Sequence, residues 1–97
     1  MSEVDCFYVR GSQADVPAVK AALEAIPYDR GAVQVVVEFD PLNGHDIAVD
    51  VETYRGISAT TVTASLIEPM AGWSVLDSDE MASAIEAEML GTTLTPL

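Results

Sequence analysis

The fold depends on residues 33–52, VQVVVEFDPLNGHDIAVDVE, which contain two runs of alternating apolar and polar residues. From Val33 to Phe39 the odd positions are apolar, and the same is true from Ile47 to Val51. Alternation with a period of two is typical of a strand that buries one face. The stretch therefore predicts a β-hairpin with one face toward a core.

The length of the connecting loop decides how the two strands pair. A two-residue turn at Asn43 and Gly44 would put the two apolar faces on opposite sides, because side chains alternate in direction along a strand. A five-residue loop from Pro41 to His45 keeps both apolar faces together, and we predict this loop. The pairs are then Asp40 with Asp46, Glu38 with Ala48, Val36 with Asp50 and Gln34 with Glu52. One face of the hairpin thus carries five carboxylates.

Residues before the hairpin predict a strand and a helix. Residues 4–10 are apolar and β-favouring without clean alternation, which is typical of a strand covered on both faces. Ser12 and Asp15 match a capping box, and Pro17 is tolerated only in a first helical turn. Pro27 ends the helix. The apolar stripe of this helix is Val16, Val19, Leu23 and Ile26.

Residues after the hairpin predict one more strand and one more helix. Residues 58–67 are rich in Thr, and we expect a strand there. A short edge strand around Trp73 is a further candidate. Residues 77–91 begin with acids that suit a helix N-terminus and end at Gly91, a typical C-cap. The apolar stripe of this second helix is Met81, Ile85 and Met89.

Together these elements predict an α+β fold, a two-layer sandwich with the order β-α-β-β-β-α. A mostly antiparallel sheet of three to five strands carries both helices on one face. We assign residues 1–91 to a single acidic domain and residues 92–97 to a flexible C-terminal tail. The sequence has no pattern of a signal peptide or a membrane span, so we expect a cytoplasmic protein, in the host cytoplasm for a phage protein.

Charge restricts the partners of this chain. Sixteen acidic residues against four basic ones give a net charge of −12, and no Lys or Arg follows Arg55. Because 49% of the residues are apolar, we expect the chain to fold despite this self-repulsion. Direct binding to nucleic acid or to an anionic membrane is excluded, since both require basic side chains. A basic protein partner is favoured, and the apolar content also allows a homodimer.

Residues that carry catalysis or hold metal ions are few. A single histidine, His45, and a single cysteine, Cys6, provide neither a nucleophilic triad nor a zinc site, and the thiol is expected to be a buried small hydrophobe. Asp40, Asp46 and Asn43 could offer oxygen atoms to calcium, although their spacing differs from an EF-hand. We predict no enzyme activity, no cofactor and no metal site, with a cation at this loop as the alternative.

The acidic hairpin face predicts a surface for a basic partner. Adjacent strands lie ~4.8 Å apart and same-face residues ~6.7 Å apart, so carboxylates at this pitch resemble a row of phosphates. We predict a non-catalytic protein that binds a nucleic-acid-binding protein and inhibits it by nucleic-acid mimicry. In size, charge and lack of catalytic groups it resembles phage-encoded inhibitors such as anti-CRISPR proteins, and immunity proteins that neutralise nuclease toxins. The alternative is a small self-associating assembly protein, for example of a phage, whose acidity serves only solubility.

The residues predicted to contact the partner are the hairpin acids, two acids of the second helix and two aromatic residues at element edges. They are Glu38, Asp40, Asp46, Asp50, Glu52, Glu86, Glu88, Trp73 and Tyr54. Aromatic rings at such edges anchor interfaces or cap a core, and both roles stay open for Trp73 and Tyr54. One contiguous acidic face would favour the inhibitor, and an even spread of acids would favour solubility.

Overall fold

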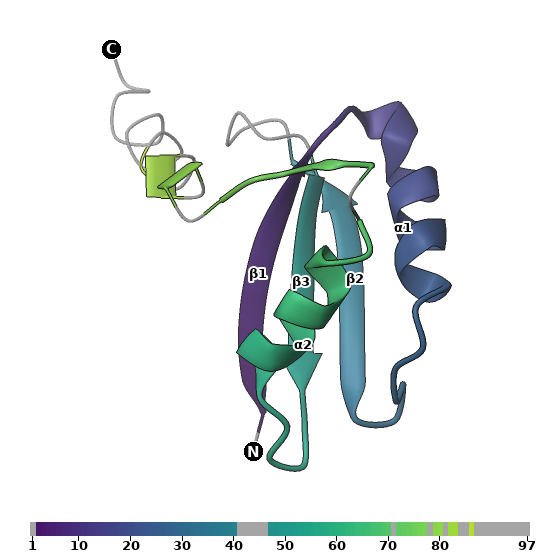
Figure 1. The fold of residues 1–97 in the computed structure, drawn as a ribbon, viewed down its shortest axis with the longest axis vertical. Helices are drawn as coiled ribbons and strands as arrows, with labels where there is room; N and C mark the ends of the chain where they lie inside the picture. The colour runs from purple at the N-terminus through teal and green to yellow at the C-terminus, as the bar shows by residue number, and fades with distance from the viewer. Residues whose placement is uncertain are drawn as a thin grey trace.

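The computed structural model describes residues 2–40, 47–70, 72–77, 79, 80, 82, 83 and 86. It contains β1 (Glu3–Arg10), the 3-10 helix η1 (Gln13–Asp15), α1 (Val16–Glu24), β2 (Val33–Phe39), β3 (Ile47–Thr53), α2 (Ala59–Ile67) and β4 (Ser74–Val75). The predicted α+β fold is confirmed, because α1 and α2 pack against the same core on one antiparallel sheet (Figure 1).

The hairpin has the predicted register. β2 and β3 are antiparallel, and their pairs are Gln34 with Glu52, Val36 with Asp50 and Glu38 with Ala48. The predicted pair of Asp40 with Asp46 and the loop from Pro41 to His45 lie outside the described residues. The hydrophobic alternation alone therefore identified which side chains share a face.

The remaining strands extend the sheet to the order β2-β3-β1-β4. β1 is antiparallel to β3 over seven residue pairs, and one of these pairs places Cys6 opposite Asp50. β4 is only two residues long and pairs with Val9 and Arg10 at the end of β1. The two ends of the sheet order therefore differ, with a full-length strand at one side and a fragment at the other.

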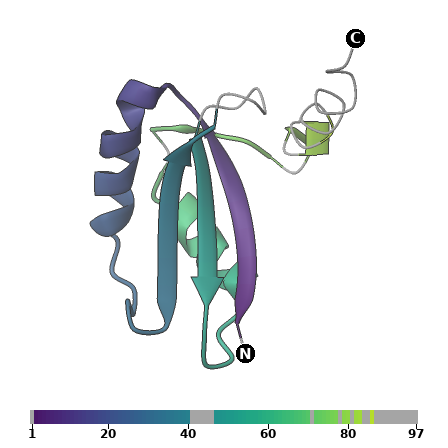
Figure 2. The same cartoon turned by 180° about the vertical axis from the view of Figure 1, so that it is seen from behind.

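The core lies between one face of the sheet and the two helices. Fully buried side chains from the odd positions of the strands meet Val19 and Leu23 of α1 and Leu66 of α2. The strand residues are Phe7, Val9, Ile47, Val49 and Val51. Burial of each large apolar side chain stabilises the fold by about 1.5–3 kcal/mol. Even-numbered strand residues point to the opposite face, which Figure 2 shows with α2 behind the strands.

Residues 58–67 were expected to be a strand, and this expectation is wrong. Ala59 to Ile67 is the helix α2, and the Oγ atom of Ser58 caps it by accepting from the backbone N–H of Thr61 at 3.3 Å. The buried residues Ala59, Thr63 and Leu66 recur every three to four positions, as a helix face requires. Packing of this face across β1 and β3 outweighs the β-propensity of the threonines.

The predicted helix start after β4 is present as a capping box. The backbone N–H of Glu80 donates to Oδ1 of Asp77 at 2.8 Å, and the N–H of Asp77 donates to Oε1 of Glu80 at 3.2 Å. Residues 79, 80, 82, 83 and 86 have helical backbone. Gly91, the tail 92–97 and the stripe of Met81, Ile85 and Met89 lie outside the described residues.

The turn between β3 and α2 contains two residues in the left-handed region. Arg55 has φ 61° and Gly56 has φ 78°, and the N–H of Ile57 donates to the carbonyl of Tyr54 at 3.2 Å. Glycine adopts this conformation without a steric penalty, whereas a residue with a Cβ is destabilised by about 1–2 kcal/mol. Arg55 is therefore a strained position at an exposed turn.

Substitution of Arg55 by Asn should raise the free energy of unfolding by about 1 kcal/mol, because Asn tolerates the left-handed conformation of this turn. Urea unfolding at equilibrium measures the change. Arg55→Ala is the matched control, since it removes the same charge but keeps an ordinary Cβ. Equal stability of the two variants would contradict a backbone origin of the gain.

Candidate protein-binding face

The even-numbered residues of β1, β2 and β3 form what we call the open sheet face. Its described members are Val4, Cys6, Tyr8, Arg10, Gln34, Val36, Glu38, Ala48, Asp50 and Glu52, and Tyr54 follows at the end of β3. Three of these side chains are carboxylates, and the one base among them is Arg10, at the end of β1. A shallow hollow of about 380 Å³ lies on this face, lined by Val4, Gln34, Val36, Glu38, Asp50, Val51 and Glu52.

The acids on the open sheet face are staggered across the strands. Asp50 lies between Val36 of β2 and Cys6 of β1, and Glu38 faces Ala48. Glu52 faces Gln34. Like charges directly opposite each other destabilise a sheet, and these described pairs avoid that arrangement. The face thus concentrates negative charge without placing any of these three carboxylates directly across from another.

Tyr54 holds Glu52 in place. Its hydroxyl donates to Oε1 of Glu52 and lies 3.5 Å from Oε1 of Gln34. The hydrogen bond to Glu52, with desolvation and the negative charge of that carboxylate, raises the pKa of Tyr54 above its usual range. The phenol therefore stays protonated at neutral pH and continues to donate. Glu52 and Tyr54 form a fixed polar pair at one end of the face.

Cys6 is a half-buried and unreactive thiol. Burial raises the pKa of Cys6 to about 12, and the hydrogen bond with Asp50 and the charge of Asp50 add to the shift. Only the thiolate is a nucleophile, so this thiol is inert at neutral pH. Asp50 lies directly opposite Cys6 on the neighbouring strand β3.

The structure brings together four of the predicted contact residues, Glu38, Asp50, Glu52 and Tyr54, on or beside one face. Asp40 is half-buried at the end of β2. Asp46 and Glu88 lie outside the described residues. Glu86 is exposed and belongs to the helical residues that follow β4.

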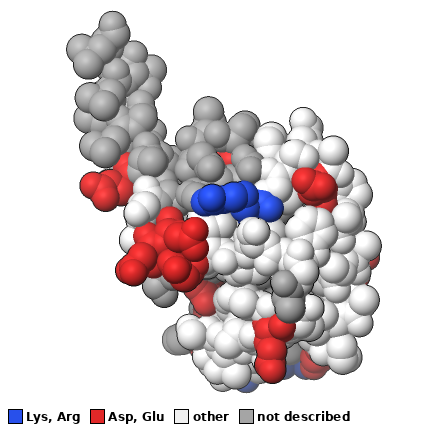
Figure 3. All heavy atoms as spheres, turned by 45° about the horizontal axis from the view of Figure 1, so that its top comes forward, with Lys and Arg blue, Asp and Glu red and all other residues white. Residues whose placement is uncertain are grey.

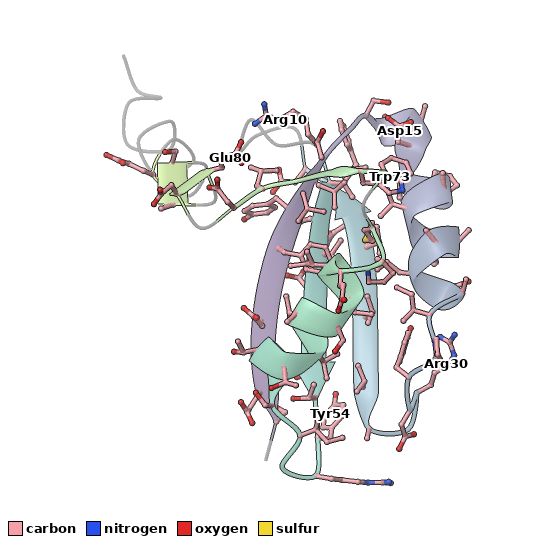
Figure 4. The ribbon with its side chains drawn as sticks, viewed as in Figure 1. Arg10, Asp15, Arg30, Tyr54, Trp73 and Glu80 are labelled. Carbon is pink, nitrogen blue, oxygen red and sulfur yellow. The ribbon has the colours of Figure 1, made fainter. Side chains whose placement is uncertain are left out.

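Acids also gather away from the open sheet face. Asp77, Asp79 and Glu80 are exposed where the chain leaves β4, and Glu80 forms an ion pair with Arg10 at 3.8 Å. Figure 4 shows Arg10 and Glu80 at the end of the sheet opposite Tyr54. In the view of Figure 3 the acidic side chains form separate groups. The described acids that are visible in this view are therefore clustered, but they do not form one continuous surface.

Trp73 lies apart from the acidic face. Its ring is half-buried and packs against the core, and it lines a hollow of about 350 Å³ with Arg10, Ser74, Val75, Leu76 and Glu80. Packing against the core is one of the two roles that the sequence left open for Trp73, namely that of a cap on the core.

Two apolar residues of the open sheet face were missed as site residues. Val4 is 68% exposed and Val36 is 42% exposed, and they are the exposed large hydrophobic side chains of the described chain. Val4 was assigned to a strand covered on both faces, which is wrong because both helices pack on the other side. Val36 stands at an even position of the hairpin, between Gln34 and Glu38, where the alternation places polar side chains. The sequence alone therefore indicated an apolar side chain on this face.

The described part of the chain contains no group of three or more His, Cys, Asp or Glu side chains placed to hold a metal ion. None of its helices is long and apolar enough to cross a membrane. No protein-family model, curated protein or solved structure matches this chain. The geometry of the open sheet face is therefore the basis for a functional proposal.

Substitution of Asp50 by Asn should increase the alkylation rate of Cys6 severalfold at about pH 8.5, because it removes a charge that opposes the thiolate. Iodoacetamide labelling followed by mass spectrometry measures the rate. Glu38→Gln is the matched control, since it removes one charge from the same face without changing the neighbour of Cys6. If both variants reacted at the wild-type rate, Asp50 would not influence this thiol.

Proposed function

We propose that this protein binds a basic protein partner through the open sheet face and blocks the nucleic-acid site of that partner. The observation that carries the proposal is the set of Glu38, Asp50 and Glu52 on a sheet face that neither α1 nor α2 covers, with Arg10 one row beyond them at the end of β1. Such a face attracts a positively charged protein surface over a distance and increases the rate at which the two proteins associate. The partner class is a nucleic-acid-binding protein with a basic channel.

The spacing of the carboxylates supports mimicry of nucleic acid. Asp50 and Glu52 lie on the same face of β3, two residues apart, which corresponds to ~6.7 Å along a strand. Glu38 lies on the neighbouring strand, one row further along the sheet. Carboxylates held at regular spacing on a rigid sheet offer a basic channel a pattern similar to that of phosphates.

Preorganisation and apolar contact add to the electrostatic attraction. The hydroxyl of Tyr54 fixes Glu52, so this side chain has less rotational freedom to lose on binding. Val4 and Val36 line the same hollow as the acids and offer apolar area to a partner. Exposed apolar area beside charge is typical of an interaction site.

In this proposal the protein acts by occupying the nucleic-acid site of its partner and does not catalyse a reaction. It would act in the cytoplasm, as the small phage-encoded inhibitors and immunity proteins that it resembles do. Binding of this kind weakens as salt rises, because screening acts on exposed charges. It also competes with nucleic acid for the partner, which distinguishes mimicry from binding elsewhere.

The immobilised protein should capture nucleic-acid-binding proteins from a nuclease-treated lysate and release them on addition of double-stranded DNA or of roughly 0.3–0.5 M NaCl. Mass spectrometry identifies the released proteins. The combined variant Glu38→Gln, Asp50→Asn and Glu52→Gln should lose this capture, since it removes the three charges of the face.

The matched control for capture is Glu3→Gln, Glu24→Gln and Glu68→Gln. These three residues are exposed outside the open sheet face, and both triple variants change the net charge from −12 to −9. The control should capture as the wild type does. Equal loss in both triple variants, or capture that DNA does not displace, would contradict the proposed site.

The variant Glu38→Gln and Asp50→Asn should melt about 2–5 °C higher than the wild type at about 10 mM salt, because it relieves repulsion on the face. Differential scanning calorimetry measures the shift, which should vanish at about 0.5 M NaCl. Glu3→Gln with Glu68→Gln gives the effect of net charge alone. A melting temperature no higher than that of this control would show that the acids of the face do not lower stability.

A further inference from the structure

The two edges of the sheet differ in protection. At the β1 edge the carboxylate of Asp5 accepts from the N–H of Cys6 at 2.9 Å. Beyond it, β4 covers Val9 and Arg10, and the N–H of Leu76 donates to the carbonyl of Tyr8 at 3.0 Å. Acidic side chains and short strands prevent further pairing at an edge. The β1 edge is thus largely blocked.

The β2 edge is less protected, because β2 is seven residues long and Glu38 is its one acidic side chain, although α1 lies beside β2 (Figures 1 and 2). Its sequence VQVVVEF contains no Pro, Gly or Lys. The N–H of Tyr54 donates to the carbonyl of Ala32 at 2.9 Å. The backbone N–H and C=O groups of even-numbered β2 residues therefore form hydrogen bonds with β3, whereas those of odd-numbered residues point away from β3. Within the described chain, nothing accepts from the outward N–H groups of Val35 and Val37.

A hollow and an arginine side chain held by two hydrogen bonds lie beside the β2 edge. A hollow of about 380 Å³ is lined by Glu24, Tyr28, Arg30, Val33, Gln34, Val35 and Tyr54. The guanidinium of Arg30 lies 4.5 Å from the centre of the Tyr28 ring and donates to the Tyr28 hydroxyl at 2.8 Å. It also donates to the carbonyl of Glu24 at 2.6 Å. The charge of Arg30 is therefore held at the β2 edge.

We propose that a second copy of this chain pairs with the β2 edge as an antiparallel strand, with a two-fold axis at Val36. This register uses all seven residues of β2. The pairs are Val33 with Phe39, Gln34 with Glu38, Val35 with Val37, and Val36 with its own copy. Val35 and Val37 then exchange backbone hydrogen bonds, and the two Val36 residues form a non-hydrogen-bonded pair.

The register is complementary in polarity and charge. Apolar residues meet apolar residues, and the amide of Gln34 faces the carboxylate of Glu38 instead of a second acid. Beyond the strand ends, Asp40 of one copy comes opposite Ala32 of the other, two positions from Arg30. Each end of the shared pairing therefore brings a base near an acid. A partner strand of unrelated sequence would not share this two-fold match.

The dimer would join two open sheet faces into one surface. Eight strands would be continuous, and Val36 would lose much of its exposure. The contact is small, so we expect a weak and reversible dimer. Because each copy carries −12, added salt strengthens this association, whereas it weakens binding to a basic partner. The pairing is independent of the proposed function, and the opposite salt dependence distinguishes the two.

Disulfide trapping tests the register. In a Cys6→Ser background, Val36→Cys should form covalent dimers under mild oxidation at about 0.5 M NaCl, because a non-hydrogen-bonded pair has a Cα separation of about 4.5 Å, within the range of a disulfide. Gln34→Cys is the matched control, since its two copies would lie roughly 13 Å apart. Absence of trapping at position 36, or equal trapping at position 34, would overturn the proposal.

Sedimentation equilibrium tests the edge without cross-linking. Val36→Lys should weaken self-association at least tenfold, because two lysines meet at the axis, while Asp50 opposite position 36 supports the folded monomer. Val4→Lys makes the same charge change on the same face away from β2 and should associate as the wild type does. A wild-type protein that stays monomeric at about 1 mM in about 0.5 M NaCl would overturn the proposal.

Discussion

The pairing register of β2 with β3 is the constraint on which the rest of the structure depends. It places Val49 and Val51 toward α1 and α2, and Asp50 and Glu52 toward the opposite face. A shift of β3 by one residue would exchange these two sets, because side chains alternate along a strand. Carboxylates would then face the apolar stripe of α1, where an unpaired charge is strongly unfavourable. Core and acidic face are thus two consequences of the same register.

The strong negative charge is tolerated because its local arrangement limits repulsion. On the open sheet face the carboxylates are opposite uncharged residues, and Tyr54 donates to Glu52. At the other end of the sheet, Glu80 contributes to a capping box and lies 3.8 Å from Arg10. That exposed ion pair is worth little by itself, at most about 1 kcal/mol. Burial of the apolar core supplies the stabilisation that allows an acidic and partly apolar face without either α1 or α2 packed on it.

Periodic signals in the sequence predicted more of this molecule than residue propensities did. The alternation in residues 33–52 predicted the register and three acids of the face, and the capping residues predicted both helix starts at Ser12 and Asp77. The threonines of residues 58–67 suggested a strand, but packing across the sheet selected a helix. The exposure of Val4 could not be inferred from the sequence, because it depends on both helices packing against the same face of the sheet.

The hairpin register can be measured directly by nuclear Overhauser effects in the labelled protein. Even-numbered residues of β2 bond to β3, so Val35 with Val51 and Val37 with Val49 are non-hydrogen-bonded pairs whose Hα atoms lie close together. Strong Hα–Hα contacts within these two pairs are the result that we predict. Contacts displaced by one residue, such as Val35 with Asp50, would contradict the register and the acidic face that follows from it.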